Sequence, residues 1–382
     1  MILELHLLQS FPVSNLNRDD LGQPKSATFG GVPRARISSQ SLKRAARTLF
    51  TEHGLDATNV GSRTKRLVTA TTEALAKRGR DTEQAPQIVA AALHQLGFGV
   101  ENTQLTEYLL FVGGDAVALL ADFCEQNWDT IADAVEEAQK SKKSSTQAIK
   151  IPKAKPSKEV AAAAKRIFDA TRAADIALFG RMIADNTDFN VDAASQVAHA
   201  ISTHAVATEF DYYTAVDDLK REDEPGADMI GTIDFNTACY YRYANLDLTQ
   251  LGRNLHGDQE LVSQAAQAWL GSFIHSTPGG KQTTTAARTM PETLLGTVRS
   301  GGAWNLANAF LRPVTGTDLL GSSTERLFSH FQSLRGFYGT AELHTVAGAA
   351  LSCASDPLPA EDSVTGLDEF TTRLLTTALE PA

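Results

Sequence analysis

The sequence predicts an α+β fold, because its strand-like and helical segments are grouped and do not alternate evenly. Short strand-like runs lie near the start and in the second half of the chain, around a long Ala-rich block with helical spacing. Even alternation of strands and helices would indicate a doubly wound parallel sheet, whereas segregated elements favour α+β. The chain has 382 residues, which is enough for one large domain with insertions or for two domains.

The first half of the chain predicts a strand followed by helices. Residues 1–8 alternate leucines with Glu4 and His6, which predicts a strand with one buried face. Residues 62–135 are Ala-rich with apolar residues at helical spacing, which predicts a helical block. A long helix is expected from about residue 157 to residue 182, and a second over about 191–204.

Two segments differ from their neighbours. Residues 140–158 contain seven lysines, four serines, two prolines and no acid, so we expect a mobile linker. Residues 209–235 contain two strand-like runs around a highly charged middle that turns at Pro225-Gly226. This pattern predicts a protruding β-hairpin with a solvated tip.

The C-terminal part predicts further strands and helices. The run CYYRYANLDL predicts a strand with Cys239, Tyr241 and Tyr243 on one face and Tyr240 and Arg242 on the other. The remaining elements are an amphipathic helix over about 258–275, a flexible loop over 276–288, a strand at 292–300 and a helix beginning near residue 360.

Composition narrows the class of protein. The 42% hydrophobic and 21% charged content is ordinary for a soluble globular protein, and no apolar run could span a membrane. Three widely separated cysteines favour a reducing cytoplasm, and none has a partner at metal-ligand spacing. We therefore expect neither a metal nor a cofactor.

Charge is distributed unevenly along the chain. Residues 1–80 carry 13 Lys and Arg against 6 Asp and Glu, a net charge of +7, while the whole chain has −10. Positive charge at one end of an acidic protein indicates a polyanion bound at one face.

The basic segment has the parts of a phosphate site. Ser38 and Ser39 can cap a helix that places its apolar residues on one side. Its other side carries Gln40, Lys43, Arg44 and Arg47. Gly30-Gly31 offers backbone that can approach a ligand closely. A solvated basic helix face is the alternative interpretation.

These residues resemble a known family. The run SNLNRDD, a following Lys, FGG and RARISSQSLKRAAR resemble the N-terminal signature of the CasC family, the backbone subunit of the type I-E CRISPR surveillance complex Cascade. The resemblance continues at 175–182, 198–219, 240–248 and 279–282.

The resemblance implies an RRM-like (ferredoxin-type) palm with a helical fingers insertion and a protruding β-hairpin thumb. The expected boundaries are palm at 1–60, fingers at 61–183 with the Lys-rich linker 140–158, a palm helix at 184–208, thumb at 209–235 and palm at 236–382.

The implied function is a non-catalytic, cytoplasmic subunit that oligomerises along crRNA and presents it to target DNA. Its implied partners are crRNA, the target DNA strand, copies of itself in a hexameric filament and the other Cascade subunits.

The resemblance also implies RNA contacts. Seven residues of the N-terminal segment would line the guide-RNA groove: Arg18, Lys25, Ser38, Gln40, Lys43, Arg44 and Arg47. Met182, Tyr212 and Tyr213 would contact bases, although one tyrosine of an alternating pair could face the core. Lys281 could hold a phosphate or be a plain loop lysine. Arg242 could meet RNA on the sheet or pair with Asp234.

Two other functions stay open. A metal-dependent endoribonuclease could use Asp19 or Asp217, although consecutive acids rarely aim at one ion and Asp19 could simply orient Arg18. A general RNA chaperone without a fixed assembly is the third hypothesis.

Overall fold

The computed structural model describes residues 1–101, 104–141, 157–169, 173–183, 186–215, 229–351 and 358–380. The chain divides into two compact units. The first comprises Met1–Gly54, Ser195–Thr249 and Ala266–Ala382, and the second comprises Leu55–Ala194 and Gln250–Ala265. Most of the Lys-rich linker and the tip of the expected hairpin, with Asp217, lie outside the described residues.

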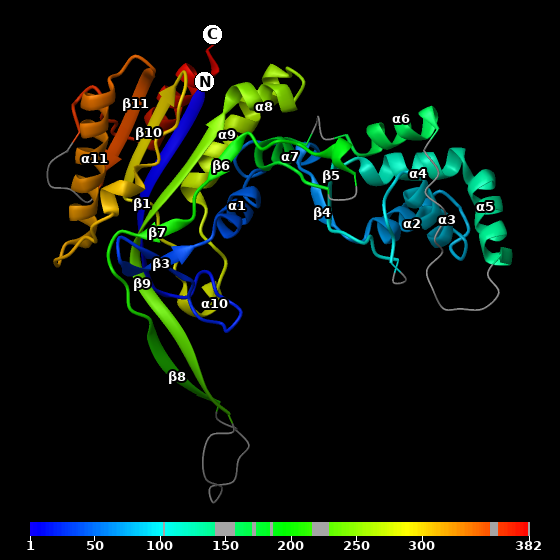
Figure 1. Cartoon of the computed structure of the whole chain (residues 1–382), viewed down its shortest axis with the longest axis horizontal. Coiled ribbons are helices and arrows are strands. Elements are labelled where there is room, and N and C mark those ends of the chain that lie inside the picture. The colour runs from blue at the N-terminus through cyan, green and yellow to red at the C-terminus, as the bar shows by residue number, and fades with distance from the viewer. Residues whose placement is uncertain are drawn as a thin grey trace, which may run out of the picture. The chain divides into compact units, whose positions relative to one another are not determined.

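The first unit is built on an antiparallel sheet (Figure 1). Its strand order is β11-β10-β1-β9-β7-β3-β2, and β6 and β8 also pair with β9. The strands are β1 (Ile2–Ser14), β2 (Ser26–Phe29), β3 (Val32–Ile37), β6 (Ser195–Val197), β7 (Ala200–Ser202), β8 (Glu209–Ala215), β9 (Met229–Asp247), β10 (Thr293–Arg299) and β11 (Leu343–Ala350). The expected α+β class is confirmed to the extent that the chain combines helices with an antiparallel sheet.

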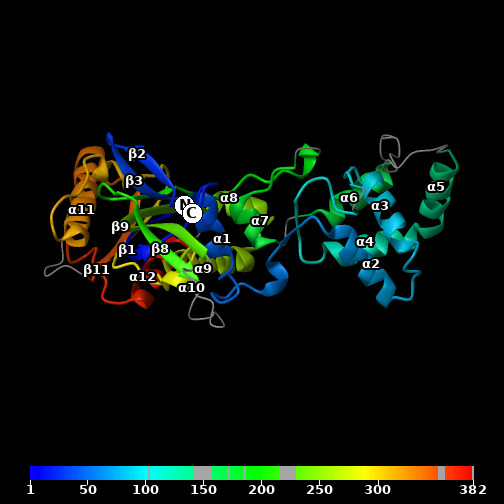
Figure 2. The same ribbon diagram turned by 90° about the horizontal axis from the view of Figure 1, so that it is seen from below.

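Helices cover both faces of this sheet. Those of the first unit are α1 (Ser39–Arg47), α10 (Gln282–Thr285), the 3-10 helix η3 (Leu306–Phe310), α11 (Leu319–Tyr338) and α12 (Leu367–Leu379). Both α8 (Leu248–Asn254) and α9 (Gln259–His275) have residues in each unit. One face packs against α11 and η3 through Tyr241, Leu295 and Phe328. On the other face, a side chain at Gly296 would collide with Leu374 of α12. Figure 2 shows α11 and α12 on different sides of the strands.

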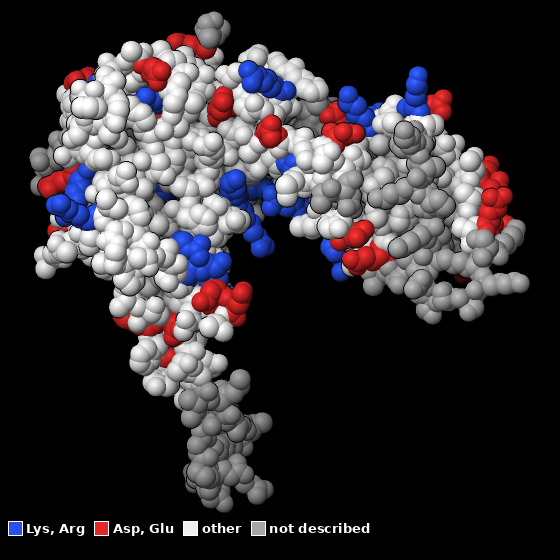
Figure 3. Space-filling model, viewed as in Figure 1, with Lys and Arg blue, Asp and Glu red and all other residues white. Residues whose placement is uncertain are grey.

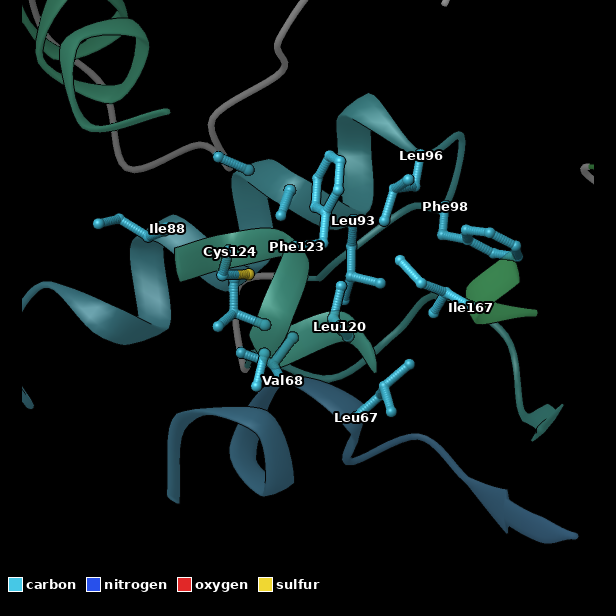
Figure 4. Close-up of a cluster of buried hydrophobic side chains, with 14 of the residues drawn as sticks. Leu67, Val68, Ile88, Leu93, Leu96, Phe98, Leu120, Phe123, Cys124 and Ile167 are labelled. Carbon is cyan, nitrogen blue, oxygen red and sulfur yellow. The ribbon is translucent and has the colours of Figure 1, made fainter. Parts of the chain in front are cut away.

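The second unit is mainly helical, as the Ala-rich block predicts. Its elements are η1 (Ala57–Asn59), β4 (Ser62–Thr64), α2 (Leu67–Lys77), α3 (Ala85–Gln95), β5 (Leu110–Val112), α4 (Ala116–Gln126), α5 (Trp128–Ser141), α6 (Lys158–Ile167), α7 (Ala174–Phe179) and η2 (Thr187–Phe189). Leucines and phenylalanines from α2, α3 and α4 meet in one core (Figure 4), which Ile167 of α6 joins.

Several expected elements need correction. The helix expected over about 191–204 is wrong, because these residues form β6 and β7, whose pairing with β9 outweighs the helical preference of an Ala-rich sequence. The helix expected from 157 to 182 is two helices, α6 and α7, and α7 ends at Gly180 with φ +76°. The expected hairpin arm and the following strand are one continuous strand, β9.

The first strand is buried on both faces rather than one. Glu4 and His6 are each 1% exposed, because helices lie on both sides of the sheet. The Glu4 carboxylate accepts hydrogen bonds from the Tyr243 hydroxyl, the Thr297 hydroxyl and the backbone N–H of Trp304. The Tyr241 hydroxyl accepts from the N–H of Leu306 and forms a second hydrogen bond with Nδ1 of His6, at 2.9 Å. Burial favours the neutral form of His6.

This burial predicts a dependence of stability on pH. Burial lowers the pKa of His6 to about 3, whereas an unfolded chain protonates histidine near pH 6.5. Below pH 6.5 the unfolded state therefore takes up a proton that the folded state does not. We expect His6 to lower the free energy of unfolding by about 2 kcal/mol between pH 7 and pH 5.

Urea unfolding at both pH values checks this for the wild type and His6→Phe. The substitution should remove about this much of the pH dependence, even if it lowers stability at pH 7. His344→Gln, at an exposed histidine, is the control. Equal pH dependence in wild type and His6→Phe would contradict the expectation.

Candidate nucleic-acid interface

Helix α1 has the capped, two-sided form that the sequence predicts. The Ser38 hydroxyl accepts a hydrogen bond from the N–H of Ser41, which satisfies one of the unpaired donors at the helix start. Leu42 and Ala46 are buried. Gln40 and Arg44 are exposed, and Lys43 and Arg47 are half-buried. The basic side of α1 is therefore the side that reaches the surface, whereas Ser38, 6% exposed, has a structural role.

The loop before α1 is tied to the helix and to β9. Nδ2 of Asn15 donates to the carbonyl oxygens of Gly22 and Asp234, at 3.0 and 2.9 Å. The Asn17 side chain accepts from the N–H of Ser38 at 2.8 Å, and its carbonyl accepts from the N–H of Lys25. These bonds fix the backbone on which the exposed Arg18 and the half-buried Lys25 are carried.

Asp19 organises the same loop. Its Oδ1 accepts from the backbone N–H groups of Leu21 and Gln23, both at 2.9 Å, as in an Asx turn. The idea that Asp19 orients Arg18 is thus replaced by a backbone role. Within the described ranges, no group of three or more His, Cys, Asp or Glu residues is arranged to hold a metal ion.

The glycine turn has a structural role. Gly30 and Gly31, with φ +64° and +81°, form the tight turn between β2 and β3. A Cβ at Gly30 would lie 1.7 Å from the carbonyl oxygen of Leu311, so the chain itself approaches closely here. Buried Arg34 fixes the same hairpin by donating to the carbonyls of Phe29, Ser202 and Phe310.

A further cation, Arg36, lies beside the loop. Arg36 donates to Nδ1 of His199 at 3.1 Å. Burial, then the charges of Arg36 and Lys25, lower the pKa of His199. Arg36 and Lys25 therefore both add positive charge at this site, and the sequence pattern did not indicate Arg36.

The segment 277–290 lies across from α1 and forms a groove with it. The groove has a volume of about 570 Å³, and its lining includes Arg44, Leu49, His275, Arg288 and Met290. Gly280 contacts the N-terminal loop so closely that a Cβ would lie 2.3 Å from the carbonyl oxygen of Leu16. This contact places the half-buried Lys281 next to the loop that carries Arg18 and Lys25.

Arg242 lies inside the protein and not on an exposed sheet surface. It is 3% exposed and donates to the side chain of Gln9, to the Phe273 carbonyl at 2.6 Å and to the Ser276 hydroxyl at 3.1 Å. Burial lowers its pKa to about 10. The sequence left two alternatives for Arg242, a contact with RNA and a pair with Asp234. Both are wrong, because α9 covers the face of the sheet on which Arg242 lies.

The two tyrosines of the hairpin are both on the surface. Strands β8 and β9 pair from Glu209–Phe235 to Ala215–Met229 as a two-stranded ribbon. Tyr212 is 66% and Tyr213 is 44% exposed, so neither faces a core. Tyr213 lies over Gly231, where a Cβ would be 2.5 Å from its ring.

Met182, in the second unit, is 86% exposed. Its neighbour Arg181 is buried and donates to the carbonyls of Phe111, Phe168 and Phe189. The side chain of Arg181 points into the protein, and that of the next residue, Met182, points into solvent.

Positive charge is concentrated on the first unit around α1 and the N-terminal loop. Figure 3 shows Lys and Arg side chains grouped over α1 and the adjoining N-terminal loop. The structure thus brings the cationic residues of two sequence segments, 18–47 and 277–290, to one surface.

The family described as CT1975-like protein matches residues 3–372. The chain belongs to this family. The resemblance to the CasC family is thereby confirmed over nearly the whole length of the CT1975-like chain.

Two solved structures are similar to this CT1975-like protein. A chain of a "CRISPR RNA-guided surveillance complex, pre-nicking" is 27% identical, with a TM-score of 0.83 over 99% of this chain and 100% of that one. A chain of a "CRISPR RNA-guided surveillance complex" is 24% identical, with a TM-score of 0.73 over the same shares, and shows a similar fold. No curated protein matches. No helix in the described ranges combines the length and apolar character that crossing a membrane requires.

The glycine turn offers a paired test of how this surface is held. Alanine at Gly30 or at Gly31 costs roughly 1–2 kcal/mol of backbone strain, because both have left-handed φ angles. Only Gly30→Ala adds a collision, since no atom lies within 4 Å of a Cβ at Gly31. We expect Gly30→Ala to lower the free energy of unfolding by about 1–3 kcal/mol more than Gly31→Ala does. Urea unfolding measures both, and equal losses would speak against the contact with Leu311.

Proposed function

We propose that this CT1975-like protein is the non-catalytic, RNA-binding backbone subunit of a type I-E CRISPR surveillance complex. The observation that carries the proposal is the similarity, over 99% of the chain at 27% identity, to a chain of an RNA-guided surveillance complex. The clustered cations on α1 and the 277–290 segment support it, because a single-stranded RNA is bound mainly through its phosphates.

The proposed contacts to crRNA come from one surface of the first unit. They are Arg18, Lys25, Gln40, Lys43, Arg44, Arg47 and Lys281, each of which is exposed or half-buried. Ser38 acts as the helix cap and Arg242 as an internal support, so we leave both out of the contact set. Contacts to phosphates position a strand without reading its sequence, which suits a protein that must accept any guide.

Exposed apolar side chains supply the proposed contacts to bases. Tyr212 and Tyr213 on the hairpin, and Met182 in the second unit, offer flat or soft surfaces on which an unstacked base can lie. In this proposal the first unit is an RRM-like palm, the second is the fingers and the β8–β9 hairpin is the thumb. The thumb would contact the RNA held by a neighbouring copy.

Assembly follows from the same proposal. Copies of the protein would form a hexameric filament along the crRNA, together with other Cascade subunits. Most guide bases would remain available to the target DNA strand, so that base pairing and not the protein would read its sequence.

Removing two cations should weaken RNA binding without regard to sequence. We expect Lys25→Ala combined with Lys43→Ala to flatten the slope of log affinity against log salt concentration by roughly 1.4, at about 0.7 per contact with a single strand. Fluorescence anisotropy with labelled RNAs of different sequence, titrated with salt, measures this.

The matched control is Lys77→Ala with Arg253→Ala, which removes two exposed cations from helices outside this surface. The proposed contact set is wrong if the two double variants have the same affinity and slope.

The protein should bind RNA without cutting it. Asp19, the described member of the nuclease hypothesis, already uses its Oδ1 for two backbone hydrogen bonds. We expect intact labelled RNA after incubation with protein and Mg²⁺ or Mn²⁺. RNA cleavage that is lost in Asp19→Asn or Asp217→Asn would instead establish the metal-dependent nuclease.

A further inference from the structure

The groove between α1 and the 277–290 segment carries unpaired positive charge on both of its walls. Arg44 lies on the wall formed by α1, and Arg288 lies on the opposite wall. Both are exposed, and neither guanidinium has an ion pair or hydrogen bond in the part of the chain that the structure describes. None of the lining residues is acidic, although the chain as a whole has a net charge of −10. Such a groove favours an anion.

The wall that carries Arg288 is anchored at several points. Nε2 of Gln282 donates to the carbonyls of Pro278 and Ala287, at 2.9 and 3.1 Å, and so ties together the two ends of the segment. The Thr289 hydroxyl donates to the Ser10 carbonyl at 2.7 Å, and Gln9 donates to the Thr289 carbonyl at 2.6 Å. The loop expected from the sequence is thus tied by hydrogen bonds within itself and to β1, and these bonds hold the backbone on either side of Arg288.

The same segment contains two strained positions. Lys281 and Ala286 have φ angles of +52° and +46°, which side-chain-bearing residues rarely adopt. Gly280 is held against the carbonyl oxygen of Leu16. Surrounding structure must impose such strain, and strained backbone is concentrated at binding sites.

Apolar side chains accompany the arginines. Ala45 of α1, Leu49 in the turn after α1 and Met290, which is 49% exposed, also line the groove. The volume of about 570 Å³ falls within the range of small-molecule pockets. Guanidinium groups suit phosphate oxygens, and a soft apolar surface suits a base. The groove therefore combines the two surfaces that one nucleotide requires.

We propose that this groove is a nucleotide pocket for the bound RNA, in which Arg288 and Arg44 hold the phosphate from opposite walls and Leu49 and Met290 contact the base. The inference rests on the proposed RNA-binding function and adds Arg288 as a contact residue. The pocket adjoins the proposed RNA surface that includes Lys43 and Lys281. A base bound in it would be removed from solvent.

The test compares wild type, Arg288→Ala, Arg288→Lys and the control Arg253→Ala, using a fluorescein-labelled oligouridylate and a salt titration. Loss of a charge-assisted contact should weaken binding about tenfold. It should also flatten the salt slope by about 0.7. Arg288→Lys should retain the slope, because the charge remains. Circular dichroism checks that each variant is folded.

A second measurement locates the base directly. Oligouridylate containing 4-thiouridine should cross-link to peptides that contain Leu49 or Met290, and Arg288→Ala should reduce this cross-link selectively. Cross-links on neither wall, or an Arg288→Ala variant that binds like Arg253→Ala, would overturn the pocket.

The two proposals fail in different ways. If the wild type does not bind the oligouridylate, or the Lys25 and Lys43 double variant keeps full affinity, the proposed RNA surface is wrong. If that double variant weakens binding while Arg288→Ala does not, the surface stands and only the nucleotide pocket is wrong.

Discussion

The buried guanidinium of Arg242 is the interaction on which the proposed interface depends. A charge that is removed from water needs hydrogen-bond partners, and Arg242 has three of them, in the Gln9 side chain, the Phe273 carbonyl and the Ser276 hydroxyl. It joins β9 to Gln9 of β1 and to the end of α9. Gln9 in turn holds Thr289, beside Arg288 in the wall of the groove. The sheet, the helix end and the groove are thus parts of one polar network.

Other buried arginines also join separate segments of this protein by hydrogen bonds. Because they are buried, the number of cations in a segment is a poor measure of the charge at its surface. Arg34 and Arg181 each donate to three backbone carbonyls from inside the molecule. Arg34 contributes to the net charge of +7 in residues 1–80, although it is fully buried. The number of cations in a segment therefore overstates the number available to a polyanion, and only the fold separates the two sets.

The sequence predicted those features that depend on local pattern. The cap and two-sided character of α1, the arms of the hairpin and the faces of Tyr240 and Tyr241 are set by neighbours along the chain, and they are as expected. The features that the sequence did not predict depend on contacts between segments that are far apart in the chain. An Ala-rich stretch became β6 and β7 because β9 was available to pair with it. Arg288 was missed because its importance comes from lying across a groove from Arg44, and the two are far apart in sequence.

The continuity of β9 has a mechanical consequence for the proposed assembly. Its 19 residues pair with β8 in the hairpin and with β1 in the sheet, so the same strand carries the proposed thumb and Arg242. At about 3.3 Å per residue, β9 extends over roughly 60 Å. A flexible joint would let the thumb vary its position, whereas a continuous strand anchored in the core fixes its base relative to the groove. In a filament of identical copies, the distance between groove contact and thumb contact would then be the same in every subunit. A regular spacing along the guide would follow from the protein's own backbone, without any information from the RNA sequence.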